Sequence, residues 1–247
     1  MTDRVTYTGM VIKCSDVKEY DKRLVILTRE MGKIVVFARG AKRPKSALVP
    51  ASRIFAYGEF ELYPGKDAFS LNKVYINEMF ENLTKDITAV CYGSYFLEMV
   101  DYFTQDGVRA DNILKLLYIT LKALENDNIP NELIRYIFEL KMLVFSGEYP
   151  ETFQCLKCQK ENVMYFSAAA GGCLCKEHQK QYGDSISLSE STLYTMQYII
   201  TSKLEKLYTF LVKPEVLNEL RFVMKRYMSL HVDKEFKSLE ILNALLK

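Results

Sequence analysis

Apolar residues alternate with polar ones, or cluster in short runs, along the first 80 positions of the chain, a pattern typical of β-strands. Glu30-Met31-Gly32-Lys33 is expected to form a tight turn between two of these strands, with Gly32 at positive φ. Five short strands separated by turn residues predict a small closed barrel of the OB type. The expected strands cover residues 6–13, 22–28, 34–38, 53–63 and 69–80.

From Asp86 onward the apolar spacing becomes helical. Two sets of residues each define one helix face, and the segment 126–131, which contains Pro130, separates them. The first set is Ile113, Leu117, Leu121 and Leu124, and the second is Leu133, Ile137, Leu140 and Val144.

Helical spacing returns after residue 187. Ser187 and Glu190 have the spacing of a capping box, so we expect Ser187 to cap the helix that follows. Pro214 is placed as a first-turn proline of the next helix, and residues 238–246 predict a short amphipathic helix.

Cysteines are concentrated between the two helical blocks. Cys155 and Cys158 form one C-x-x-C hook, and Cys175 and His178 form a second hook of the C-x-x-H type. Two such hooks predict a tetrahedral structural zinc site at about residues 150–185. Cys173 is a further thiol that could replace Cys175 or His178 as a ligand.

Two other interpretations of this cluster stay open. The cysteines could be unpaired buried thiols without a metal, or the zinc could be catalytic. Four protein ligands leave no position for an activated water, and no H-E-x-x-H or H-x-E arrangement supplies a general base. The structural site is therefore the expectation.

Composition narrows the class of protein. With 49% hydrophobic and 26% charged residues among 247, the chain has the composition of a folded protein rather than a disordered or collagen-like one. It lacks an apolar run long enough for a membrane span, and Met1-Thr2-Asp3-Arg4 does not begin a signal sequence, so we expect a cytoplasmic protein. Phosphate-binding glycine loops and nucleophile-elbow motifs are also missing from the sequence, which favours binding over catalysis.

The net charge of +2 is unevenly distributed. Residues 1–53 contain twelve basic and five acidic side chains, a net charge of +7, whereas the remaining 194 residues carry −5. A positive groove combined with exposed aromatic rings is how OB folds bind single-stranded nucleic acid. We expect phosphate contacts from Lys33, Arg39, Lys42, Arg43, Lys45 and Arg53.

Stacking on bases must use tyrosine or phenylalanine, because the chain has no tryptophan. Tyr20 lies in a polar stretch and is the preferred candidate, and Tyr57 is a second. Phe37 and Phe55 also lie near the basic segment, but core packing is the favoured interpretation for both.

The order of these features resembles the RecO family of bacterial recombination mediators. The resemblance covers nearly the full length. It rests on the hairpin 24–39, on Gly40-Ala41-Lys42-Arg43-Pro44-Lys45-Ser46, and on Phe138-Glu139-Leu140-Lys141-Met142-Leu143 followed by Gly147-Glu148-Tyr149-Pro150 and the first cysteine hook. Gly171-Gly172-x-x-Cys175 and Lys237-Ser238-Leu239 add to it.

The resemblance implies an α+β multidomain protein, with an N-terminal OB-fold β-barrel at 1–80 and an all-α domain at 81–247 that carries an inserted zinc-binding module. It implies binding to single- and double-stranded DNA, strand annealing, and loading of RecA onto strands coated by single-strand binding protein (SSB), within the RecF pathway. The implied partners are RecR and the C-terminal tail of SSB, and the implied location is the nucleoid. The family commonly has a cysteine at the position of His178, so the choice between His178 and Cys173 as the fourth ligand stays open.

An SSB tail would need an apolar pocket with a basic rim, for which Lys203, Lys206, Arg221, Lys225 and Arg226 are candidates. The competing hypotheses are a zinc-dependent enzyme that modifies nucleic acid and a structural adaptor whose basic face docks an acidic protein. Covalent change of DNA would indicate the first, and a tight protein complex without salt-dependent DNA affinity would indicate the second.

Overall fold

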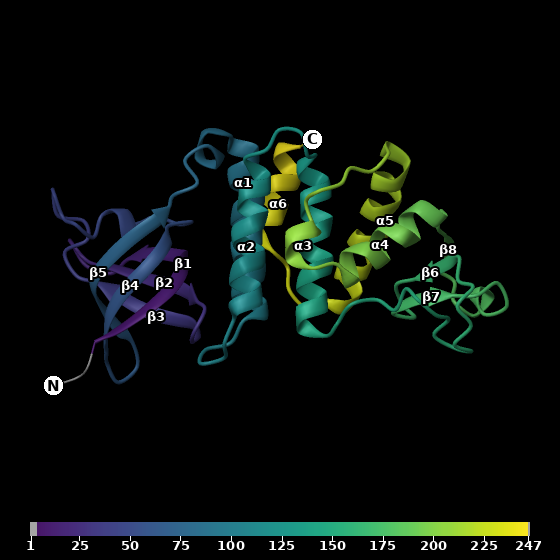
Figure 1. The fold of residues 1–247 in the computed structure, drawn as a ribbon, viewed down its shortest axis with the longest axis horizontal. Coiled ribbons are helices and arrows are strands. Elements are labelled where there is room, and N and C mark those ends of the chain that lie inside the picture. The colour runs from purple at the N-terminus through teal and green to yellow at the C-terminus, as the bar shows by residue number, and fades with distance from the viewer. Residues whose placement is uncertain (1–3, 247) are drawn as a thin grey trace. The chain divides into compact units, whose positions relative to one another are not determined.

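The computed structural model describes residues 4–246 (Figure 1). Five strands come first: β1 (Val5–Asp16), β2 (Lys22–Thr28), β3 (Gly32–Ala38), β4 (Tyr57–Pro64) and β5 (Phe69–Glu78). They close into a barrel in the order β1-β2-β3-β5-β4, in which every neighbouring pair is antiparallel except β3 with β5. The predicted OB-type barrel is therefore confirmed.

Alternation of side chains along the strands fills the barrel interior. On β3, Ile34, Val36 and Ala38 are buried, whereas the alternate residues Lys33, Val35 and Phe37 are half-buried. Ile34 and Val36 join Leu24, Ile26, Phe60 and Leu62 in one core cluster. Gly32 ends the β2–β3 turn at a φ of +60°, as expected.

The helices of the structure are α1 (Ile87–Phe103), α2 (Asp111–Leu124), α3 (Asn131–Ser146), α4 (Glu190–Thr201), α5 (Pro214–His231) and α6 (Lys237–Leu245). Asp86 caps α1 by accepting the backbone N–H of Thr88. Pro214 is the first-turn proline of α5, as the sequence predicts. Short 3₁₀ turns lie at Pro50–Ser52, Leu83–Lys85, Gln179–Gln181 and Leu204–Lys206. Within the described residues 4–246, we find no helix with the length and apolarity to cross a membrane.

The expected capping box at Ser187 is wrong. Ser187 belongs to the short strand β8 (Ile186–Ser187), which pairs with β6 (Tyr165–Ser167), so its backbone is already committed to a sheet. Ser189 is the cap instead, because its hydroxyl accepts the backbone N–H of Thr192 at 3.2 Å. The strand β7 (Gly172–Leu174) completes this three-stranded sheet.

Two compact units divide the chain. The first contains the barrel, α1, α2 and, from Phe236 onward, α6. The second runs from Asn126 to Glu235 and contains α3, the small sheet, α4 and α5. The change from strands to helices falls between Glu78 and Ile87, and the assignment of residues 1–80 and 81–247 as separate domains stays a prediction.

Candidate nucleic-acid interface and metal centre

Two loops meet at one end of the barrel: residues 17–21, between β1 and β2, and residues 39–56, between β3 and β4. The carbonyl of Tyr20 accepts the backbone N–H of Lys42 at 3.0 Å. The Oδ1 atom of Asp21 accepts the backbone N–H of Gly40 at 2.8 Å. These two hydrogen bonds hold the first turn of the basic loop against the loop that carries Tyr20.

The side chains on this end of the barrel form an exposed group. The Arg43 guanidinium lies over the Tyr20 ring, 5.6 Å from its centroid, in a cation–π arrangement. Tyr20 is 42% exposed, so it offers ring surface to solvent. We call Tyr20, Arg39, Lys42, Arg43 and Lys45 the loop surface, and all five residues are exposed.

Asp16 limits how much of this positive charge is free. Its carboxylate lies 2.7 Å from the Lys42 ammonium and 3.7 Å from that of Lys22. The hydrogen bond from Lys42 is the main reason that the pKa of Asp16 lies below its ordinary value. Among residues 4–246, Arg39, Lys45 and Arg53 form no ion pair with a carboxylate, so they carry uncompensated charge.

The other two predicted phosphate contacts, Arg53 and Lys33, differ in position. Arg53 is exposed on the same loop, directly after Ser52, whose carbonyl lies 3.1 Å from the Cys14 thiol. Lys33 is at the opposite end of β3, where its ammonium donates to the backbone carbonyl of Asp101 at 2.6 Å. The side chain of Lys33 is only 19% exposed, so the structure does not bring it to the loop surface.

The other aromatic candidates are less accessible than Tyr20. Phe55 is 1% exposed, which confirms its interpretation as a core residue, and Phe37 is half-buried on β3. Tyr57 is half-buried and packs against Tyr118 of α2, with 4.9 Å between the ring centroids. Tyr20 therefore remains the ring best placed for stacking at this end of the barrel.

The predicted metal ligands converge. Cys155, Cys158, Cys175 and His178 each bring one donor atom into a group in which all four atoms lie within 4.8 Å of one another. The shortest contacts include Cys175 Sγ to His178 Nδ1 at 3.2 Å and Cys158 Sγ to Cys175 Sγ at 3.8 Å. Three thiols and an imidazole are a donor set that fits a tetrahedral metal ion, so the cluster could hold one.

Backbone amides favour the thiolate forms that a metal needs. Burial opposes ionisation of Cys155, but N–H groups of Cys175, Lys157 and Cys158 outweigh it and lower the pKa of Cys155 to about 6. Burial likewise opposes ionisation of Cys175, whereas the N–H groups of His178 and Glu177 lower its pKa below the ordinary value. Thiolates are the metal-binding form of cysteine, so the backbone prepares these two ligands for a cation.

Cys173 is not part of this group. It is fully buried in β7, where its N–H donates to Glu151 and its carbonyl accepts from Leu156. Burial raises the pKa of its thiol to about 12, the opposite of what a metal ligand needs. These contacts give Cys173 a packing position beside the cluster rather than in it.

Gly172 lets the second hook approach the chain near Glu151. Its φ is +156°, and a Cβ at this position would lie 2.3 Å from the Glu151 carbonyl oxygen. Ser167 of β6 pairs with Gly172 in the small sheet, and its hydroxyl donates to the Asp184 carboxylate at 2.6 Å. The metal cluster is thus supported by a backbone contact that excludes any larger residue at position 172.

The five cations expected to line an apolar pocket do not share one environment. Arg221 ion-pairs with Glu132, and Arg226 lies 3.5 Å from the Asp184 carboxylate. The remaining three, Lys203, Lys206 and Lys225, are exposed.

Sequence reasoning did not identify Asp16 and Asp21, whose carboxylates contact residues of the basic loop. Both lie at the β1–β2 turn, where aspartate commonly accepts backbone N–H groups. That preference could have suggested a role for Asp21, but its partner Gly40 is distant in sequence and only the barrel brings them together.

Comparisons with known proteins agree with this architecture. Residues 1–80 match the family model described as Recombination protein O N terminal, and residues 84–240 match Recombination protein O C terminal. The DNA repair protein RecO of Alkaliphilus metalliredigens is 33% identical over 236 residues, which cover 94% of this chain and 96% of the relative. That of Acetivibrio thermocellus is 31% identical over 241 residues, 96% of each chain.

These matches cover both units and include the loop surface and the metal cluster. The structure agrees with these matches, because it has a barrel of the expected type and a helical part with a cluster of three cysteines and one histidine. The two relatives are 31–33% identical to the chain along nearly its whole length. The chain belongs to the RecO family of DNA repair proteins.

Proposed function

We propose that this protein is a recombination mediator of the RecF pathway that binds single- and double-stranded DNA and anneals complementary strands. The observation that supports this most directly is the loop surface, where the basic loop is held against the loop of the exposed Tyr20 by one backbone hydrogen bond and one to the Asp21 carboxylate. Phosphates would be bound by the uncompensated cations, and Tyr20 would stack on a base.

Annealing needs no bond to be made or broken. Two strands repel each other through their phosphates, and a cationic surface lowers that repulsion while the bases pair. The residues required are therefore cations and a stacking ring rather than an acid–base pair. We accordingly propose that the protein is not an enzyme.

The metal proposed for the cysteine cluster is zinc in a structural role. Cys155, Cys158, Cys175 and His178 would hold it, and four protein donors would fill its tetrahedral coordination. The ion would tie the two hooks together and stabilise the small sheet. This donor set disfavours the alternative of a zinc-dependent enzyme, because no ligand position is left for water or substrate.

The proposed partners are RecR, the C-terminal tail of SSB and, indirectly, RecA at the nucleoid of the cytoplasm. Loading of RecA would require the protein to act on strands that SSB already coats. For the SSB tail we propose contacts with the exposed Lys203, Lys206 and Lys225, since Arg221 and Arg226 are engaged by Glu132 and Asp184.

The test is charge reversal of Arg39, Lys42 and Arg43 to glutamate in one variant. Affinity for a single-stranded oligonucleotide is measured across salt concentrations, with circular dichroism as the check on folding. We expect weaker binding and a salt slope reduced by ~0.7 for each phosphate that the variant no longer neutralises. Unchanged affinity at low salt would refute a DNA-binding role for the loop surface.

A strand-annealing assay on SSB-coated complementary oligonucleotides tests the mediator role itself. The wild-type protein should accelerate annealing and the charge-reversed variant should not. Reversal of the exposed Lys66 and Lys85 on the same unit is the control, since it changes the net charge by −4, against −6 in the triple variant, without altering the loop surface.

A further inference from the structure

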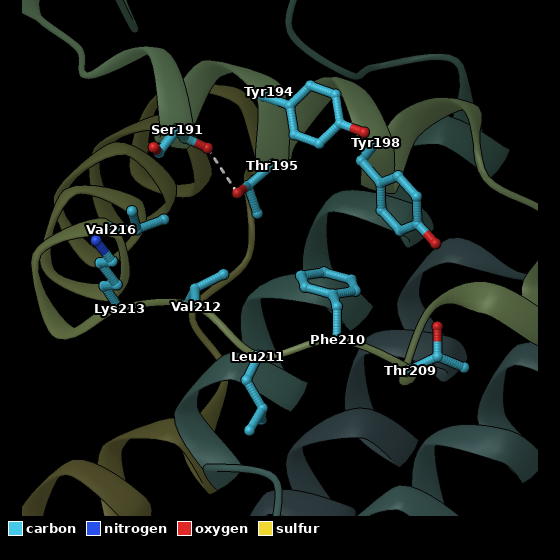
Figure 2. A pocket seen from close by; sticks show the side chains of 10 residues that line it. All are labelled: Ser191, Tyr194, Thr195, Tyr198, Thr209, Phe210, Leu211, Val212, Lys213 and Val216. Atoms are coloured by element: carbon cyan, nitrogen blue, oxygen red, sulfur yellow. Dashed lines mark hydrogen bonds between the residues drawn. The ribbon is translucent and has the colours of Figure 1, made fainter.

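A groove lies in the second unit between α4 and the segment that leads into α5 (Figure 2). It has a volume of about 450 Å³, within the range of small-ligand sites. Tyr194 and Tyr198 come from α4, and Phe210, Leu211 and Lys213 come from the segment opposite. Neither the loop surface nor the metal cluster includes any of these residues.

Aromatic rings line both sides of this groove. Tyr194 and Tyr198 are one helical turn apart, with 6.3 Å between their ring centroids, and Phe210 meets Tyr198 edge to face at 5.1 Å. Tyr194 is 67% exposed, far more than core packing would leave it. Figure 2 shows the Phe210 ring facing the two tyrosines across the opening. The rings therefore present an open aromatic surface.

Lys213 is the only charged residue among the described residues that line the groove. No carboxylate pairs with it among residues 4–246, so its ammonium is available to an anion. The other polar groups of the lining are hydroxyls, among them Thr209, which donates to the Lys206 carbonyl at 2.9 Å. The groove thus combines stacking surface, hydroxyl groups and one positive charge.

We propose that this groove is a second site for single-stranded nucleic acid, in which a base stacks on Tyr194 and Tyr198 and an adjoining phosphate binds Lys213. The inference rests on the proposed function, since annealing brings together two strands and the loop surface accounts for one. A stretch of several acidic residues would find only one cation in the lining, whereas a single nucleotide needs only one. Flat rings open to solvent match a base, which has a π-face whatever its identity.

The experiment separates base contacts from phosphate contacts. Affinity of the full-length protein is measured for an oligothymidylate and for an abasic oligonucleotide of the same length. We expect Tyr194→Ala to weaken binding of the oligothymidylate about five- to tenfold, the effect of removing one stacked base, and to leave the abasic affinity unchanged. Tyr194→Phe keeps the ring and should retain wild-type affinity for both.

Tyr149→Ala is the matched control, because Tyr149 is another exposed tyrosine of the same unit and lies outside the groove. It should alter neither affinity. The Tyr20→Ala variant removes the base contact expected at the loop surface. The losses of binding free energy caused by Tyr20→Ala and Tyr194→Ala should add. Lys213→Gln should lower the salt slope by ~0.7, the value of one phosphate contact on single strands.

The proposal is overturned if Tyr194→Ala leaves both affinities unchanged or weakens both equally. It is also overturned if Tyr194→Ala abolishes binding of an Asp- and Phe-containing peptide with a free C-terminal carboxylate while DNA affinity stays the same, since the groove would then be a peptide site. Failure of the proposed function is a separate result, namely wild-type DNA affinity in the variant with Arg39, Lys42 and Arg43 reversed.

Discussion

The Asp21 carboxylate accepts the backbone N–H of Gly40 at 2.8 Å and so fixes the start of the basic loop against the loop that carries Tyr20. An acidic residue thereby helps to build a surface proposed to bind an anion. Its charge and its hydrogen bond have opposite effects on DNA affinity, so substitution can separate them.

Asp21→Ala should weaken single-stranded DNA binding about three- to tenfold, because the variant lacks the hydrogen bond that orders the loop. Charge alone predicts the opposite sign, since the variant removes a negative charge near phosphate. Asp21→Asn keeps an acceptor oxygen and should bind at least as tightly as wild type. Fluorescence anisotropy at fixed salt measures all three, and tighter binding by Asp21→Ala would show that the hydrogen bond is not needed.

Asp16 provides the complementary case. Its carboxylate pairs with Lys42 and Lys22 without organising the loop backbone, so it competes with phosphate for both ammonium groups. Asp16→Asn should therefore tighten DNA binding by about twofold, in keeping with the small free energy of an exposed ion pair. Titration at low and high salt checks this, because the gain should shrink as salt rises.

Metal content tests the ligand set directly. A Cys155→Ser, Cys158→Ser variant should lose the zinc that we expect at about one ion per chain, and its thermal unfolding should begin at a lower temperature. Cys173→Ala is the control, because Cys173 lies outside the cluster and should leave metal content unchanged. Elemental analysis measures the zinc content of both variants, and zinc retained by the double variant would show that other residues bind it.

Gly172 should tolerate no side chain. Gly172→Ala places a Cβ 2.3 Å from the Glu151 carbonyl oxygen, so we expect a decrease of about 2–4 kcal/mol in the free energy of unfolding. Gly183 is in the same segment and has open space at its Cβ, so Gly183→Ala should change stability by less than about 1 kcal/mol. Equal urea midpoints for the two variants would contradict the close approach.

The carboxylate of Asp101 predicts a pH dependence. Burial opposes its ionisation, but the ammonium groups of Lys13 and Lys33 outweigh this and hold its pKa below the ordinary value of 3.8. A carboxyl whose pKa is lowered by folding stabilises the protein above pH 3.8, and that contribution is lost as the pH falls through the folded-state pKa.

Asp101→Asn should therefore be less stable than wild type at pH 7 by about 1 kcal/mol, and the difference should disappear in acid. Urea unfolding of both proteins at neutral and acidic pH measures this. A difference that persisted in acid would mean that packing, and not the ion pairs, accounts for the effect. Lys33→Gln should likewise affect stability more than DNA affinity, because Lys33 is held by Asp101.

Those features that depend on local pattern could be predicted from the amino-acid sequence. The period of apolar residues indicated the barrel strands and the helix faces. The spacing of the two hooks predicted the four metal ligands that converge in the structure. Features that depend on competition between partners were less accessible. Ser187 has capping-box spacing, but strand pairing takes its backbone first, and Ser189 caps the helix.

Charge counting had the same weakness. Net charge along the sequence does not distinguish Lys33 from Lys42. Lys33 is held by Asp101 at the far end of β3, whereas Lys42 is paired with the exposed Asp16. Which cations remain uncompensated depends on carboxylates brought near by folding. The charged residues can be counted along the chain, whereas the partner of each cation is determined by the folded barrel.

Because α6 packs on α1 while the whole second unit lies between them in the chain, the first unit is a discontinuous folding module. Glu98 of α1 accepts the backbone N–H of Ser238 at the start of α6, at 3.0 Å. During synthesis on the ribosome this hydrogen bond cannot form until the final helix has emerged. A truncated product that ends at Glu125 would therefore leave the packing face of α1 without its partner, and dissection of the protein calls for a linker from residue 125 to residue 236.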